Sequence, residues 1–246
     1  MTMQILSIGL VTLGTMGIID LIAATTNAFN GALLARRPDH YRNFTVMGII
    51  IMAYFGGIGG GVLRDVLVSK VPSPLVNPWY LILCFAAAAL ALLIEYNATA
   101  KFKDGLFQFM TAFSLPWYAI VGAQTAVDAK LGYVAAIIIG VIGTTGGRYL
   151  IDVTCNVIPK QFVRGEFFVL TAAMTAGLYL VLHFSLGWDQ TLATAGAFLF
   201  GFGFRLTAQA LGWEEWEPWE PAGVKTSEKT REKLGEGLHA EFERDK

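Results

Sequence analysis

Three side chains that carry oxygen atoms are spaced along one apolar stretch in a way that suits contact with a cation. Asp20, Asn27 and Asn30 are separated by seven and three residues. These intervals are close to whole turns of a helix with ~3.6 residues per turn, so the three residues share one broad face. A carboxylate and two amides there would line a cation pathway. The alternative is that Asp20 only caps its helix.

Two glycine clusters, each with an arginine and an aspartate, lie in other apolar stretches. The clusters span Gly56–Asp65 and Gly143–Asp152. A glycine inside a helix costs roughly 1 kcal/mol relative to alanine, so each cluster predicts a helix break. Carbonyl oxygens freed by a break would bind K⁺ or Na⁺ transiently near Gly59–Gly61 and Gly146–Gly147. The alternative is close helix packing, since small residues let transmembrane backbones approach.

Arg64 and Arg148 need a role other than ion binding, because a guanidinium in a cation pathway repels cations. Three roles stay open: pairing with an aspartate, donation to carbonyls freed by a break, and a gate or lipid-headgroup contact. Arg64 and Asp65 point about 100° apart on a helix, so each is expected to find a partner on another helix. The candidate pore and gate residues are Gly56, Gly57, Gly59, Gly60, Gly61, Arg64, Asp65, Gly143, Gly146, Gly147, Arg148, Asp152, Asp20, Asn27 and Asn30.

The composition predicts the elements that position these residues. The chain has 246 residues, of which 54% are hydrophobic and 15% charged. Several apolar runs reach the about 20 residues that a helix needs to cross a ~30 Å hydrocarbon core. We therefore predict an all-α membrane protein with seven transmembrane helices, the second and fifth broken at the glycine clusters. The expected spans are 8–34, 45–69, 79–96, 106–127, 132–156, 166–185 and 190–210.

The distribution of lysine and arginine predicts the orientation. Loops on one side carry Arg36, Arg37, Arg42, Lys101, Lys103, Lys160 and Arg164, whereas loops on the other carry Lys70 and Lys130. The N-terminus is expected outside a prokaryotic plasma (inner) membrane and the C-terminus in the cytoplasm. Residues 211–246 hold many of the charges and are expected to form a cytoplasmic tail.

The two halves of the membrane domain, 1–210, resemble each other. Gly56–Asp65 aligns with Gly143–Asp152 at a constant offset of 87, and Gly31–Ala35 echoes Gly122–Ala126. Each repeat, about 8–96 and 106–185, holds three spans, so the second copy must cross the membrane in the opposite direction. Such inverted repeats are common in transporters, whose sites lie where broken helices meet. The seventh helix, 190–210, stands outside the repeats.

These residues resemble the prokaryotic trimeric intracellular cation (TRIC) channel family, whose domain is also catalogued as a putative glycine transporter. The stretch of glycines leading into Leu63–Asp65 carries the most specific part of the resemblance. The resemblance implies seven helices, a homotrimer, and a separate pore for monovalent cations, K⁺ and Na⁺, in each subunit. The chain departs from the family in the second repeat, where Ile151 matches Arg64 and an arginine stands three residues earlier, at Arg148. Three residues are close to one turn, so both can face the same direction.

Two functions stay open at the level of the sequence: a cation channel, and a secondary transporter of a small solute such as glycine. A structural membrane protein is the third alternative. No nucleophile and base pair, metal cluster or phosphate loop indicates an enzyme, and no basic stripe indicates nucleic-acid binding. Monovalent cations, membrane lipids and further copies of the chain are the expected partners. Neither a cofactor nor a structural metal site is expected.

Overall fold

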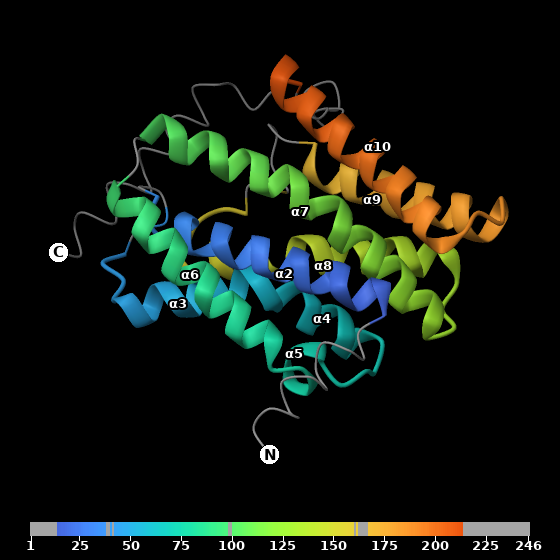
Figure 1. Cartoon of the computed structure of the whole chain (residues 1–246), viewed down its shortest axis with the longest axis horizontal. Helices are drawn as coiled ribbons and strands as arrows, with labels where there is room; N and C mark the ends of the chain where they lie inside the picture. The colour runs from blue at the N-terminus through green and yellow to red at the C-terminus, as the bar shows by residue number, and fades with distance from the viewer. Residues whose placement is uncertain are drawn as a thin grey trace, which may run out of the picture. The chain divides into compact units, whose positions relative to one another are not determined.

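The structure is a computed structural model that describes residues 14–37, 40, 42–97, 100–159, 161 and 167–213, without the side chains of 95–104. Within these ranges the chain forms helices joined by short connections (Figure 1). The predicted tail lies outside the described residues from Glu214 onward, so its division from the membrane domain stays a prediction. The helices are α2 (Thr15–Leu34), α3 (Val46–Tyr54), η1 (Phe55–Gly59), α4 (Gly60–Leu67), α5 (Ser73–Val76), α6 (Trp79–Asn97), α7 (Ala100–Asp128), α8 (Tyr133–Thr154), α9 (Phe168–Leu180), η3 (Val181–Ser185) and α10 (Gln190–Leu211).

The seven predicted spans are confirmed within the described residues; positions 8–13 of the first span and 166 of the sixth lie outside them. Six helical segments of the described chain are long and apolar enough to cross a bilayer, and a seventh, Trp79–Ile94, is apolar but shorter. The second span, Val46–Leu67, consists of α3, η1 and α4 in succession. The chain is therefore an all-helical membrane protein.

The first glycine cluster interrupts its helix with a π-turn. Phe55–Gly59, the segment η1, forms this turn, and α4 continues directly from Gly60. Single π-turns inside α-helices are rare and often mark functional sites. The break predicted in the second span therefore takes the form of a wider turn, and the chain stays helical through it.

The predicted break in the fifth span is wrong, because α8 is a continuous α-helix from Tyr133 to Thr154. Two threonines inside its glycine cluster hold the helix locally: the hydroxyl of Thr144 donates to the Gly140 carbonyl at 2.7 Å and that of Thr145 to the Val141 carbonyl at 2.9 Å. Packing against the other repeat also favours the helix. Tertiary contacts here outweigh the low helix propensity of glycine.

The backbone confirms the internal repeat at the predicted offset. α3 begins at Val46 and α8 at Tyr133, 87 residues later. The second and fifth spans also end alike, because Ser69 and Asn156 have positive φ values of 57° and 54°. The next amides close the same kind of turn, with Lys70 N bonded to Asp65 O and Val157 N to Asp152 O, both at 2.8 Å. These correspondences describe equivalent helix ends in the two copies.

The glycine clusters form one of the contacts between the two repeats, beside that of α2 with α7. A Cβ on Gly60 would overlap the carbonyl oxygen of Gly143, and a Cβ on Gly147 would lie 2.6 Å from the carbonyl oxygen of Gly56. Gly60 corresponds to Gly147 and Gly56 to Gly143, so each contact is the counterpart of the other. Such reciprocal contacts are those of a two-fold relationship. Because the order of the contacting residues is reversed, α4 and α8 cross in opposite directions, as an inverted repeat requires.

Each repeat supplies most of one apolar core. The first core gathers buried residues of α2, α3 and α6, and the second gathers those of α7, α8 and α9 together with α10. Where α2 meets α3, a Cβ on Gly31 would lie 2.6 Å from Met52 O, and its counterpart Gly122 meets Ile139 O at 3.1 Å. This pair confirms the predicted echo of Gly31 in Gly122, with an offset of 91 for the first helix of each repeat.

Candidate functional site

A cavity of about 300 Å³ lies at the end of the helices where the chain leaves α4 and α7. We call it the Asp20 cavity. Its walls come from α2, α4, α6, α7 and the segment around α5. It is lined by Met16, Gly17, Asp20, Arg64, Lys70, Val71, Ser73, Val76, Asn77, Tyr80, Val121, Gln124, Thr125 and Asp128.

Arg64 is held rigidly at the wall of this cavity. Its Nη1 and Nη2 donate to the two carboxylate oxygens of Asp20 at 2.8 and 3.0 Å, and its Nε donates to Asp65 Oδ1 at 2.8 Å. The side chain is only 1% exposed. Two-pronged pairing of this kind fixes both position and orientation. Of the three roles left open for the arginines, Arg64 therefore has the first, pairing with an aspartate. It binds Asp65, its neighbour in the sequence, as well as Asp20 on another span.

The two carboxylates around Arg64 have further donors. Tyr80 donates its hydroxyl to Asp20 Oδ2 at 2.9 Å. Ser73 donates its backbone N–H at 2.8 Å and its hydroxyl at 2.9 Å to Asp65 Oδ2. Asp20 is buried well inside α2, which begins at Thr15, so it does not cap the helix. One guanidinium and two carboxylates thus form a satisfied network with a net negative charge.

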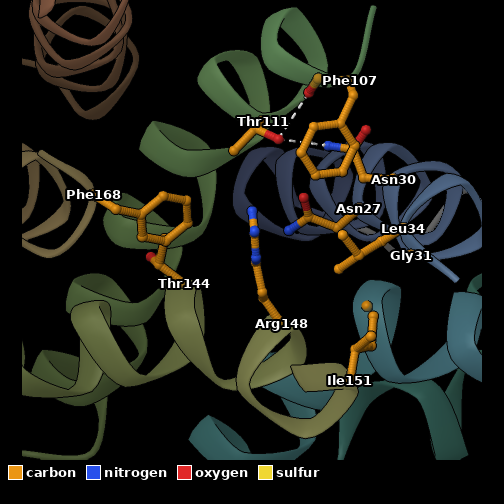
Figure 2. Close-up of a pocket in the computed structure, with 11 residues that line it drawn as sticks. Asn27, Asn30, Gly31, Leu34, Phe107, Thr111, Thr144, Arg148, Ile151 and Phe168 are labelled. Atoms are coloured by element: carbon orange, nitrogen blue, oxygen red, sulfur yellow. Dashed lines mark hydrogen bonds between the residues drawn. The ribbon is translucent and has the colours of Figure 1, made fainter. Parts of the chain in front are cut away.

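A second, smaller cavity of about 40 Å³ lies at the other end of α2 and α7. We call it the Arg148 cavity (Figure 2). A water molecule needs about 10–15 Å³ of such volume, so the cavity has room for a few waters. It is lined by Asn27, Asn30, Gly31, Leu34, Gly56, Phe107, Thr111, Thr144, Arg148, Ile151 and Phe168.

Arg148 extends into the middle of this cavity, between Thr144 and Phe168 on one side and Asn27 on the other (Figure 2). Its Nε lies 3.7 Å from Asp152 Oδ2 and has no hydrogen-bond partner among the described residues. The guanidinium carbon lies 5.5 Å from the centre of the Phe107 ring. Unlike Arg64, Arg148 is therefore held by one long ion pair and an aromatic face.

The predicted trio on α2 is divided between the two cavities. Asp20 lines the first, whereas Asn27 and Asn30 line the second. Asn30 donates to the Thr111 hydroxyl at 3.1 Å, and Asn27 Oδ1 accepts from Ser114 at 2.6 Å. The Oδ1 atom of Asn30 has no partner within the described chain, although the residue is only 7% exposed.

The cavities are counterparts under the repeat. At the offset of 87, Arg64 corresponds to Ile151, and at 91, the offset for the first helices, Asp20 corresponds to Thr111. In the same way Asn30 corresponds to Val121. Arg64 and Asp20 line the Asp20 cavity, whereas their counterparts line the Arg148 cavity. Conversely, Asn30 lines the Arg148 cavity and its counterpart Val121 lines the Asp20 cavity. Arg148 and Ile151 line one cavity together, so the arginine shares a face with the position matching Arg64, as expected.

Asp152, the counterpart of Asp65, is completely buried and has a different set of partners. His40 Nε2 lies 2.8 Å from its Oδ1. The amide of Gln161, oriented to satisfy both of its neighbours, donates to Oδ2 at 3.1 Å. Asp152 therefore joins α8 to the segments that follow α2 and α8, and it also anchors Arg148.

Most glycines of the two clusters allow close helix packing, the alternative to a pore-lining break. A Cβ on Gly60 or Gly147 would meet opposing backbone, and a Cβ on Gly143 would lie 3.6 Å from the Arg64 side chain. A Cβ on Gly59 would lie 2.8 Å from the Leu150 side chain, and one on Gly146 would lie 2.8 Å from that of Leu63. Of the glycines in the two clusters, only Gly56 lines either cavity. Neither of the two cavities is lined by Gly59–Gly61 or Gly146–Gly147, and ion binding at carbonyls there stays a prediction.

Sequence reasoning missed several hydroxyl groups of the site. Tyr80, Thr111 and Ser114 contact the predicted residues from other helices, and Tyr118 donates its hydroxyl to the Gly57 carbonyl. It also missed Arg205 of α10, which is 1% exposed and lies 5.5 Å from the Phe168 ring. The repeat offset was a usable signal for Thr111, because it places this residue opposite Asp20.

Comparisons with known proteins agree with this architecture. The family model described as "Glycine transporter" matches residues 17–96 and 108–184, one segment in each repeat and together more than half of the chain. A UPF0126 membrane protein of Deinococcus radiodurans is 29% identical over 171 residues, covering 68% of this chain and 77% of the relative. The UPF0126 inner membrane protein YadS of Escherichia coli is 24% identical, covering 65% and 74%.

Solved TRIC structures share the fold. The TRIC trimeric intracellular cation channel orthologue from Rhodobacter sphaeroides matches with a TM-score of 0.72 at 24% identity, covering 80% of this chain and 98% of that one. A second structure, from work on conductance through TRIC cation channels, matches with a TM-score of 0.71 at 23% identity, covering 84% and 98%. The chain thus has the TRIC channel fold and belongs to the glycine transporter family.

Proposed function

We propose that this protein is a channel for monovalent cations, K⁺ and Na⁺, with one pathway through each chain. The observation that carries the proposal is the pair of cavities at opposite ends of α2 and α7. Both helices line both cavities. A pathway along these helices meets oxygen atoms of Asp20, Asn27, Asn30 and Thr111, which can replace part of an ion's hydration shell.

The charges along this pathway support conduction of cations. The network of Arg64, Asp20 and Asp65 carries a net negative charge. The exposed Asp128 and Lys70 also line the cavity and balance each other, so one negative charge remains in excess. An entrance with an excess of negative charge raises the local concentration of cations. The Arg148 cavity has the opposite character, because a guanidinium occupies its centre.

We assign Arg148 as a gate. Its charge opposes entry of a cation into the small cavity, and its few contacts allow it to move aside. Arg64 cannot act in this way without leaving two buried carboxylates unpaired. We further propose a homotrimer, with the N-terminus outside a prokaryotic plasma membrane; the TRIC fold supports the first and the lysine and arginine distribution supports the second.

Recording from the purified protein in planar bilayers tests the channel. We expect discrete current steps in symmetric KCl, and a reversal potential in a KCl gradient that follows the cation. Current without discrete steps, or no current at all, contradicts the proposal.

Transport of a small solute such as glycine is the second candidate function. The Arg148 cavity favours it through two atoms of opposite kinds that have no hydrogen-bond partner among the described residues, Nε of Arg148 and Oδ1 of Asn30. A guanidinium suits a carboxylate and an amide oxygen suits an ammonium group. Uptake of labelled glycine into proteoliposomes decides between the two functions: saturable uptake without current steps supports the transporter.

A further inference from the structure

A tyrosine from another helix binds a carbonyl of the π-turn in the second span. A π-turn replaces the usual hydrogen bond to the fourth residue by one to the fifth, which changes the partners of the carbonyls around it. Gly57 lies inside the π-turn, and its carbonyl accepts the hydroxyl of Tyr118 from α7. Tyr118 is 2% exposed. The contact therefore joins the irregular part of one repeat to the first helix of the other.

Tyr118 lies between the two cavities. On α7, Thr111 lines the Arg148 cavity, and Ser114 binds Asn27 of the same cavity. One turn beyond Tyr118, Val121 lines the Asp20 cavity. On the acceptor side, Gly56, which precedes Gly57, lines the Arg148 cavity. A pathway that joins the cavities along α7 must pass the bond between Tyr118 and Gly57.

The other repeat has no such bond at the equivalent place. Tyr118 corresponds to Asn27, and Gly57 corresponds to Thr144. Both of these counterparts line the Arg148 cavity, and α8 has no π-turn. The same two positions are thus joined in one copy and separated by an open space in the other. Inverted repeats commonly work through such differences between their two copies.

We propose that the hydrogen bond between Tyr118 and Gly57 is a second gate, which closes the passage between the Asp20 cavity and the Arg148 cavity. This inference rests on the proposed channel function and concerns its regulation. While the bond is formed, the tyrosine ring occupies the passage and the Gly57 carbonyl is satisfied. When it breaks, the carbonyl becomes accessible to water or to a passing cation.

The packing around Gly57 explains why the movable part is the tyrosine. A Cβ on Gly57 would lie 2.7 Å from the Cβ of Ala28, 2.8 Å from Ala24 O and 2.9 Å from the sulfur of Cys84. The π-turn is therefore wedged against α2 and α6 and has little room to shift. Opening then requires rotation of the Tyr118 side chain away from a fixed carbonyl.

Single-channel recording of Tyr118→Phe in the full-length protein tests the gate. Loss of one hydrogen bond that forms only in the closed state should raise the open probability about 2- to 10-fold, the range expected for the net strength of such a bond. The ratio of K⁺ to Na⁺ permeability should not change. Tyr54→Phe is the matched control, because the Tyr54 hydroxyl also donates to a backbone carbonyl, that of Leu81, at 3.2 Å and outside both cavities.

A second variant keeps the test decisive if Tyr118→Phe does not fold, as judged by size-exclusion chromatography. Replacing Tyr118 by 3-fluorotyrosine keeps the ring and makes the hydroxyl a stronger donor, so it should lower the open probability. Wild-type protein without current steps refutes the channel itself. Normal wild-type current with unchanged or oppositely shifted open probability in both Tyr118 variants refutes the gate alone.

Discussion

Arg64 binds both carboxylate oxygens of Asp20, with its two terminal nitrogens at 2.8 and 3.0 Å. The pair joins α4 to α2 across the wall of the larger cavity, and both side chains are almost completely buried. Arg148, the other arginine beside a glycine cluster, has no such partner in the part of the chain that the structure describes. Two arginines that look alike in the sequence are therefore expected to respond in opposite ways to substitution.

Arg64→Ala should destabilise the protein strongly. The substitution leaves Asp20 and Asp65 buried beside each other without a cation, and breaking a buried pair in this way costs about 3–5 kcal/mol. Thermal unfolding of the purified protein, followed by size-exclusion chromatography, measures the loss. Arg64→Lys should recover only part of the stability, because an ammonium cannot reproduce the two-pronged contact. An Arg64→Ala protein as stable as the wild type would show that the network is not structural.

Arg148→Ala should leave the stability nearly unchanged and increase the current. Repulsion between two unit charges 4 Å apart in water is about 1 kcal/mol, so removing it should raise the unitary conductance up to roughly fivefold. Arg148→Lys keeps the charge and serves as the control, with a conductance near that of the wild type. Because Arg148 does not bind the ion, cation selectivity should persist. A change to anion selectivity would contradict its role as a gate.

Gly60→Ala should lower the melting temperature, because the new Cβ overlaps the carbonyl of Gly143 at the contact between the repeats. Overpacking of this kind costs about 1–3 kcal/mol. Gly61→Ala is the matched control on the next residue, where the nearest atom to the new Cβ is Arg64 Nη2 at 3.8 Å. Equal stability of the two variants would show that the repeats do not depend on this contact.

The spans and the repeat could be predicted because they rest on local properties of the chain. A hydrophobic run of sufficient length predicts a span whatever its neighbours are. The offset of 87 is visible when Gly56–Asp65 is compared with Gly143–Asp152. The form of the glycine clusters could not be predicted in the same way. Low helix propensity indicates a break in both, yet α8 stays regular because Thr144, Thr145 and the opposing backbone of the other repeat hold it.

The sequence predicted which residues belong to the candidate site better than it predicted how these residues are arranged. The spacing of Asp20, Asn27 and Asn30 specifies one face of α2, but it does not show that two separate cavities meet that face. The pairing of Arg64 with Asp20 joins residues 44 positions apart, and a single sequence holds no signal for which of several aspartates is chosen. Tyr118 went unnoticed because a tyrosine in an apolar helix is usually part of the core.

The orientation of the chain can be tested with two positions that are equivalent in the repeats. Val71 and Ile158 are related by the offset of 87, and their side chains are 64% and 74% exposed. The lysine and arginine distribution places Val71 outside and Ile158 in the cytoplasm. Cells that carry Val71→Cys, in a background with Cys84 and Cys155 replaced by alanine, should react with a membrane-impermeant maleimide. Cells that carry Ile158→Cys should react only after permeabilisation.

Because both positions follow equivalent helix ends, a difference in labelling reports the side of the membrane and not the local structure. Equal labelling of both in intact cells would contradict the inverted arrangement, and reversed labelling would place the Asp20 cavity on the cytoplasmic side.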